Sequence, residues 1–84
     1  MMQLDLFPTD LHLRCIDPSC NKRRFYMLSI QSTLFGDWVL VREWGRIGRG
    51  GRMRRDAFPS AEQALDALQA LACTKQRRGY RIAI

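Results

Sequence analysis

Residues 38–58 decide the fold of this chain, and they read WVLVREWGRIGRGGRMRRDAF. Residues 38–44 are dominated by β-branched and aromatic side chains, and they form the strongest strand pattern in the sequence. Four glycines follow within residues 45–51, so the backbone there is free to turn sharply and to approach another segment closely. Residues 52–58 then return as a second strand, so the whole stretch predicts a β-hairpin.

Two more strands are predicted before this hairpin. In residues 11–17 the side chains of Leu11, Leu13 and Cys15 alternate with those of the residues between them, which is the period of a β-strand. Residues 24–31 are rich in apolar and aromatic side chains. Turn-forming residues at 18–22 and 33–37 separate the strands from one another. The predicted order up to residue 58 is four consecutive strands.

An amphipathic helix is predicted at about residues 60–77. Ser60 is a good N-cap, and Gln63 completes a capping box with it. Apolar side chains recur at helical spacing along one face, and Gly79 is well placed to end the helix. Residues 80–84 fit a last short strand.

These elements predict an α+β fold, a small antiparallel β-sheet of about four to five strands with the helix packed on it. The length of 84 residues leaves room for one modest core. Residues 1–10 carry no clear period and are expected to form an N-terminal arm, while residues 11–84 are expected to form the single domain.

The charge of the chain favours a polyanionic partner. Lys and Arg number 14 against 8 Asp and Glu, for a formal net charge of +6. Twelve of the 14 are arginine, whose planar guanidinium binds phosphate through two hydrogen bonds and stacks on bases. Nucleic acid is therefore the first candidate partner, although codon usage in a GC-rich genome is an alternative explanation for so many arginines.

The start of the chain does not resemble a secretory signal, and the apolar runs are far shorter than a membrane span. A cytoplasmic location with no membrane partner is expected.

No metal site, cofactor or catalytic residue is predicted. The cysteine count is odd, which favours free thiols. His12, Cys15 and Cys20 fall short of the four ligands of a structural zinc site, and on a strand His12 and Cys15 point to opposite faces. The sequence offers neither a nucleophile with a base nor a Walker phosphate loop, so we expect a non-catalytic protein.

One cluster of residues carries the functional signal. On a regular strand Arg42, Trp44 and Arg46 project from the same face, so an indole ring lies between two guanidinium groups. Such a trio can stack on a sugar or base while it binds phosphate. The alternative is that Trp44 packs in the core while the arginines are merely solvated, although we expect Trp38 to be the core tryptophan.

Residues 44–48, WGRIG, resemble the signature of the WGR domain family. The resemblance extends to the NKRRFY segment at residues 21–26, to the entry into the helix at residues 58–64 and to the late Gly79-Tyr80 pair. It covers roughly residues 11–82, and the chain looks like the short freestanding bacterial members of the family.

The resemblance implies a module that binds DNA ends or breaks, as WGR domains do in poly(ADP-ribose) polymerases, so DNA is favoured over RNA. It gives Trp44 the role of packing against a nucleotide sugar and gives Arg46 a contact with DNA or with a neighbouring domain. It also places Asn21 near the terminus of the bound DNA strand. The ADP-ribosyltransferase domain of those polymerases has no counterpart here, so that activity does not carry over. The candidate nucleic-acid-binding residues are Asn21, Arg24, Arg42, Trp44, Gly45, Arg46, Gly48, Arg49, Arg52 and Arg54.

Two other functions stay open at this point. The same basic surface suits a protein-interaction or adaptor module with an acidic protein partner. A self-associating structural domain is the third hypothesis.

Overall fold

The computed structural model describes residues 10–83, so the arm expected at residues 1–10 lies outside the described residues except for Asp10. The elements, in chain order, are β1 (Asp10–Asp17), the short 3₁₀ helix η1 (Pro18–Cys20), β2 (Lys22–Ser32), β3 (Trp38–Arg46), β4 (Arg52–Phe58), α1 (Ala61–Arg77) and β5 (Arg81–Ile82).

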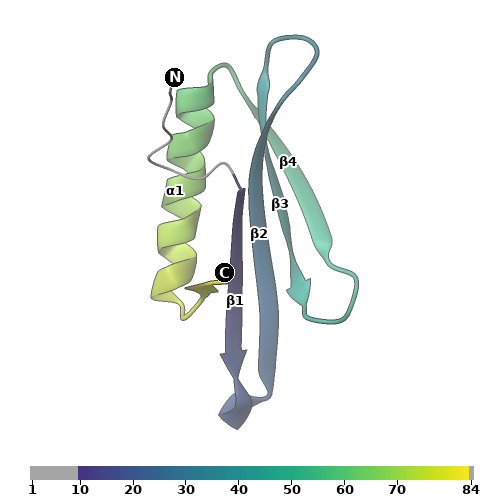
Figure 1. The fold of residues 1–84 in the computed structure, drawn as a ribbon, viewed down its shortest axis with the longest axis vertical. Helices are drawn as coiled ribbons and strands as arrows, with labels where there is room; N and C mark the ends of the chain where they lie inside the picture. Colours follow the sequence, from purple (N-terminus) through teal and green to yellow (C-terminus); the bar gives the residue numbers. More distant parts are fainter. Residues whose placement is uncertain (1–9, 84) are drawn as a thin grey trace.

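The strands form one five-stranded antiparallel sheet in the order β4-β3-β2-β1-β5 (Figure 1). Consecutive strands pair through β1 to β4, and β5 returns from the end of α1 to pair with the free edge of β1. The predicted α+β fold is confirmed. The two strands before the hairpin and the first hairpin strand are each one to three residues longer than predicted, since pairing extends into the adjoining turns.

The ends of α1 follow the predicted signals. The Ser60 hydroxyl oxygen accepts a hydrogen bond from the backbone N–H of Gln63 at 3.2 Å, which satisfies one of the helix's free donors. At the other end Gly79 has a φ of +103°, a conformation that glycine adopts without strain. Lys75 and Arg77 lie in the last turn, where the helix dipole favours cations.

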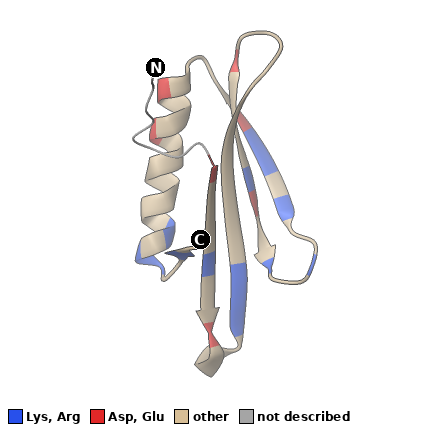
Figure 2. Cartoon of the chain, viewed as in Figure 1, with Lys and Arg blue, Asp and Glu red and all other residues tan. Residues whose placement is uncertain are grey.

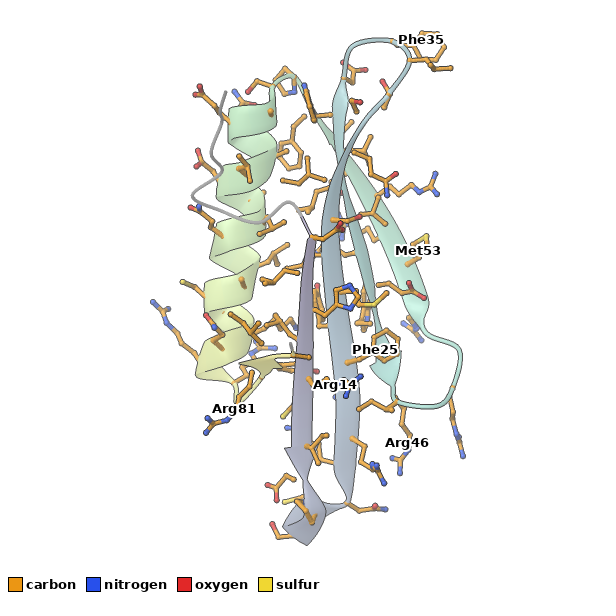
Figure 3. The ribbon with its side chains drawn as sticks, viewed as in Figure 1. Arg14, Phe25, Phe35, Arg46, Met53 and Arg81 are labelled. Carbon is orange, nitrogen blue, oxygen red and sulfur yellow. The ribbon has the colours of Figure 1, made fainter. Side chains whose placement is uncertain are left out.

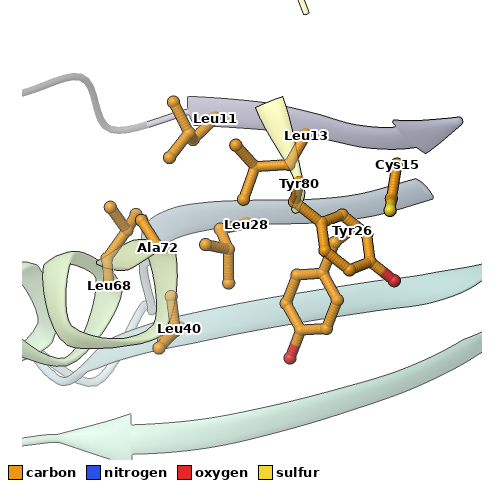
Figure 4. Close-up of a cluster of buried hydrophobic side chains, with 9 residues drawn as sticks. All are labelled: Leu11, Leu13, Cys15, Tyr26, Leu28, Leu40, Leu68, Ala72 and Tyr80. Carbon is orange, nitrogen blue, oxygen red and sulfur yellow. The ribbon is translucent and has the colours of Figure 1, made fainter. Parts of the chain in front are cut away.

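The core lies between α1 and one face of the sheet (Figure 4). The alternation predicted for β1 puts Leu11, Leu13 and Cys15 on that face, and the register pairs Leu11 with Leu28 and Leu13 with Tyr26. The largest fully buried side chains are Leu13, Leu28, Leu40 and Leu68. We call this the helix face of the sheet and the opposite one the far face.

Within residues 10–83 no helix is both long enough and apolar enough to span a bilayer.

Candidate nucleic-acid interface

A cleft opens on the helix face where α1 ends and the sheet continues past it. Its volume is about 390 Å³. Three cationic side chains and three aromatic rings lie around it, and among residues 10–83 no carboxylate lines it. The lining residues are Arg24, Tyr26, Trp44, Gly45, Arg46, Lys75 and Tyr80. We call this the basic cleft.

Strand register builds the floor of the basic cleft. Arg24 pairs with Arg46 and Tyr26 pairs with Trp44 across β2 and β3, so these four side chains share the helix face. The Tyr26 and Trp44 rings stack with centroids 5.8 Å apart and an angle of 18° between their planes. Tyr80 meets the Tyr26 ring edge-on at 6.2 Å. The result is a short aromatic platform beside a pair of arginines.

Lys75 reaches the cleft from the last turn of α1. Its Nζ atom lies 4.5 Å from the centroid of the Tyr26 ring and 5.8 Å from that of Tyr80, which are cation–π distances. Burial, with smaller effects from Arg78 and Arg42, lowers the pKa of Lys75 below its ordinary value. An anionic ligand would oppose this lowering, because its negative charge favours the protonated form of Lys75.

Within residues 10–83 no carboxylate pairs with the cations of the cleft. Neither salt bridge found within residues 10–83 includes Arg24, Arg46 or Lys75. Lys and Arg residues lie at the C-terminal end of α1, on parts of β1 and β2, along β4 and in the β3–β4 turn, whereas the acidic residues of α1 lie at its N-terminal end (Figure 2). Three cations around an aromatic platform can bind phosphate while a sugar or base stacks on the rings.

Arg42 differs from the other candidates. Its side chain is only 16% exposed, and its Nη2 atom donates to Oδ2 of Asp56 at 3.1 Å. Arg54, which is exposed, donates to the other carboxylate oxygen of Asp56 at 3.1 Å. The prediction that Arg42 shares a face with Trp44 is confirmed. However, Arg42 lies outside the cleft lining. Its mostly buried guanidinium pairs with Asp56, because a buried charge needs a partner of opposite charge.

The remaining candidates surround the cleft or lie beyond it. Arg52 is exposed on β4 directly opposite Trp44, and Arg49 is exposed in the turn between β3 and β4. Asn21 is exposed at the end of the β1–β2 hairpin with a φ of +51°, so its left-handed backbone closes η1. That position lies past Arg24, outside the cleft lining.

Glycine is required in and beside the β3–β4 turn for two different structural reasons. Gly48 has a φ of +88°, which side chains rarely allow. Gly45 and Gly51 approach each other so closely that a Cβ on Gly45 would lie 2.9 Å from the Gly51 Cα atom. A Cβ on Gly51 would press on the Trp44 carbonyl oxygen and lie 2.9 Å from Cζ of Phe25. The glycines therefore fix the hairpin against Phe25 and set the position of Trp44.

The expectation that Trp38 is the core tryptophan was wrong. Both tryptophans are half-buried on the helix face, but Trp44 packs against the core cluster and Trp38 is not part of it. The physical reason is the neighbouring rings, since Tyr26 lies beside Trp44 and extends the core toward it. Trp44 is therefore neither fully exposed nor fully buried, and it belongs to both the core and the cleft.

Sequence reasoning missed three residues of the cleft, namely Tyr26, Lys75 and Tyr80. Tyr26 and Tyr80 lie in segments that carry the family resemblance, and Lys75 lies in the last turn of the helix. The predicted opposition of His12 and Cys15 is confirmed, since His12 is exposed on the far face and Cys15 is buried on the helix face.

Residues 9–83 match the WGR domain family. The chain belongs to the WGR domain family. This family is known from modules of poly(ADP-ribose) polymerases that bind DNA breaks, and WGR domains are usually non-catalytic modules. The basic cleft of this WGR domain contains the tryptophan, first glycine and arginine of the signature, Trp44, Gly45 and Arg46.

The chain is also similar to y4dW, an uncharacterized protein of the bacterium Sinorhizobium fredii, with 43% identity over 74 residues. The aligned part is 88% of this chain and 36% of the relative, so the WGR domain spans about a third of that protein's length. No solved structure matches the chain.

Proposed function

We propose that this WGR domain binds nucleic acid without catalysing a reaction, and that its ligand is DNA at an end or a break. The observation that carries the proposal is the basic cleft, which combines Arg24, Arg46 and Lys75 with a partly open aromatic platform. The known DNA-break binding of WGR domains in poly(ADP-ribose) polymerases supports the same ligand class.

The proposed mode of binding gives each side chain a distinct role. Trp44, held by its stack on Tyr26, packs against the sugar or base of a nucleotide. The three cations bind the flanking phosphates. A phosphate beside Lys75 supplies a negative charge that stabilises its protonated amine. Exposed Arg49 and Arg52 extend the positive surface along the backbone of the ligand. Gly45 and Gly48 act indirectly by shaping the turn.

An end or break suits this cleft better than continuous duplex. The platform is only one or two rings wide and recessed beside α1, so a nucleotide must leave the regular stack to reach it. Nucleotides at a nick or terminus leave the stack at lower cost than nucleotides within a closed duplex.

The test is fluorescence anisotropy with labelled single-stranded, blunt, 5′-phosphorylated nicked and covalently closed DNA, each titrated at two salt concentrations. We expect the nicked or blunt DNA to bind most tightly and the affinity to fall with salt, by about 0.9 in log K per tenfold salt for each phosphate contact. Equal affinity for closed duplex would contradict the end preference. No binding to any of the four at low salt would refute the proposal and favour the acidic protein partner.

Two arginine variants sharpen this test. Arg46→Ala is expected to weaken binding and to reduce the salt slope by about one contact. Arg55→Ala is the matched control, since Arg55 belongs to the same arginine-rich run and is exposed, but pairs with Val41 on the far face. Equal loss from both variants would mean that only net charge matters and that the cleft has no specific role.

A further inference from the structure

The turn between β2 and β3 presents two large apolar side chains to solvent. Leu34 and Phe35 are exposed to 101% and 91% of their reference areas. They hold the two central positions of a tight turn, where polar residues and glycine are usual. Phe35 projects outward from the tip of the molecule, away from α1 (Figure 3). We call these two residues the apolar tip.

Hydrogen bonds hold the apolar tip in a defined conformation. The Thr33 hydroxyl oxygen accepts from the backbone N–H groups of Phe35 and Asp37, both at 3.2 Å. The Thr33 N–H donates to the Asp37 carbonyl oxygen at 2.9 Å, and Gly36 closes the turn with a φ of +88°. A tip that is already ordered loses little conformational entropy when it binds.

The far face of the sheet, which no helix covers, carries a group of apolar side chains among its polar ones. Phe25, Met27, Val39 and Val41 are half-buried there, and Met53 is 55% exposed. The uncovered face of an antiparallel sheet is normally polar. Methionine also adapts readily to a partner surface.

Two adjoining hollows indent the far face. The first, of about 170 Å³, has Phe25, Met27 and Ile47 among its lining and carries His12 and Arg14 beside them. The second, of about 200 Å³, shares His12 and Met27 with it. Since one water takes about 30 Å³, the first hollow has room for an apolar side chain of the size of Leu or Phe.

We propose that the far face binds a second copy of this chain, with the apolar tip of each copy inserted into the first hollow of the other. Phe25 lies near the start of β2, and the tip follows the end of β2. An antiparallel, two-fold arrangement of two far faces therefore brings each tip to the other copy's hollow, and such an interface is closed. Asp37 beside the tip then approaches Arg14 of the other copy.

Charge favours a second copy over an anionic surface. Asp37 adjoins the tip, and the β2–β3 turn contains no basic residue, whereas Lys and Arg lie on the strands and the helix end away from it (Figure 2). The β2–β3 turn has no Lys or Arg that would attract nucleic acid or an anionic membrane. Because the basic cleft lies on the helix face, the dimer would leave both clefts open, and this inference does not depend on the proposed function.

The test is the molar mass of the full chain by sedimentation equilibrium over a wide range of concentration. We expect the mass to rise from the 9.8 kDa of one chain to twice that value. Phe35→Ser and Met27→Gln should each remain monomeric at concentrations where the unaltered chain is dimeric. Ile82→Ser is the control and should dimerise normally, since Ile82 is an exposed apolar residue that pairs with Leu13 on the helix face.

A mixture of the two variants gives the sharpest result. Phe35→Ser keeps an intact hollow and Met27→Gln keeps an intact tip, so one copy of each can form one complete tip-to-hollow contact. Dimers should therefore form in the mixture although each variant alone is monomeric. Circular dichroism checks that each variant is folded, and the exposed Phe35 can be changed without loss of core packing. A chain that stays monomeric at every concentration overturns the proposal. Binding of such a monomer to neutral lipid vesicles would mean that the apolar tip contacts lipid and not a second copy. A dimer that survives Phe35→Ser also overturns the proposal.

Discussion

Substitution by alanine at Gly50 and at Gly51, two neighbouring residues beside the β3–β4 turn, should change the stability of the domain in different ways. In Gly51→Ala the new Cβ meets the Trp44 carbonyl oxygen, which is backbone, and the ring of Phe25, so β3 and β4 must separate locally. Overpacking of this kind costs about 1–3 kcal/mol. Alanine also restricts the unfolded chain, which returns about 0.4–1 kcal/mol. The expected net loss is about 1–2 kcal/mol, or roughly 4–16 °C in Tm for a domain of this size.

Gly50→Ala is the matched control. A Cβ on Gly50 meets nothing within 4 Å, and Gly50 has no positive φ, so only the unfolded-state effect acts and stability should be unchanged or slightly higher. Urea unfolding followed by tryptophan fluorescence measures both variants. Since Gly51 also positions Trp44, its variant should lose DNA affinity, whereas the Gly50 variant should not. Equal stability of the two variants would refute the close-approach explanation of the glycines.

Three further perturbations test separate parts of the structure. Trp44→Ala should lower the free energy of unfolding by about 2 kcal/mol, less than a fully buried tryptophan would, and should also weaken DNA binding; unchanged stability in a urea melt would contradict its packing on the core. Asp56→Ala removes the carboxylate partner of Arg42, which is only 16% exposed, and should lower the free energy of unfolding by about 1–3 kcal/mol; unchanged stability in a urea melt would contradict the role of this ion pair. The pKa of Asp17 lies below the ordinary 3.8 because the Ser19 hydroxyl donates to it, so Ser19→Ala should raise that pKa in an NMR titration. The carboxylate stabilises the fold above pH 3.8, and this contribution is lost as the pH falls through the lowered pKa.

The elements could be predicted from the sequence because each one is signalled locally. Alternation identifies the strand at 11–17, and the Ser60 cap identifies the start of α1 within one residue. Shared parity also put Arg42, Trp44 and Arg46 on one face, as the register confirms.

The cleft could not be predicted in the same way because it depends on where α1 ends over the sheet. That position decides that Trp44 lines the cleft and Arg42 does not, although both lie on the same face of the same strand. It also brings Lys75 and Tyr80, more than 30 residues along the chain, beside Trp44. Periodicity assigns a residue to a face, whereas long-range packing decides what covers it.

The central claim, that DNA ends occupy the basic cleft, is tested most directly by NMR titration of the labelled protein with nicked DNA. Each tryptophan indole N–H gives its own signal, and Trp38 and Trp44 lie at opposite ends of β3 on the same face. The account predicts that the Trp44 indole signal and the backbone signals of Arg24, Arg46 and Lys75 shift, while the Trp38 indole signal stays in place. Shifts confined to Trp38, the apolar tip or the far face, or no shifts at all, would contradict it.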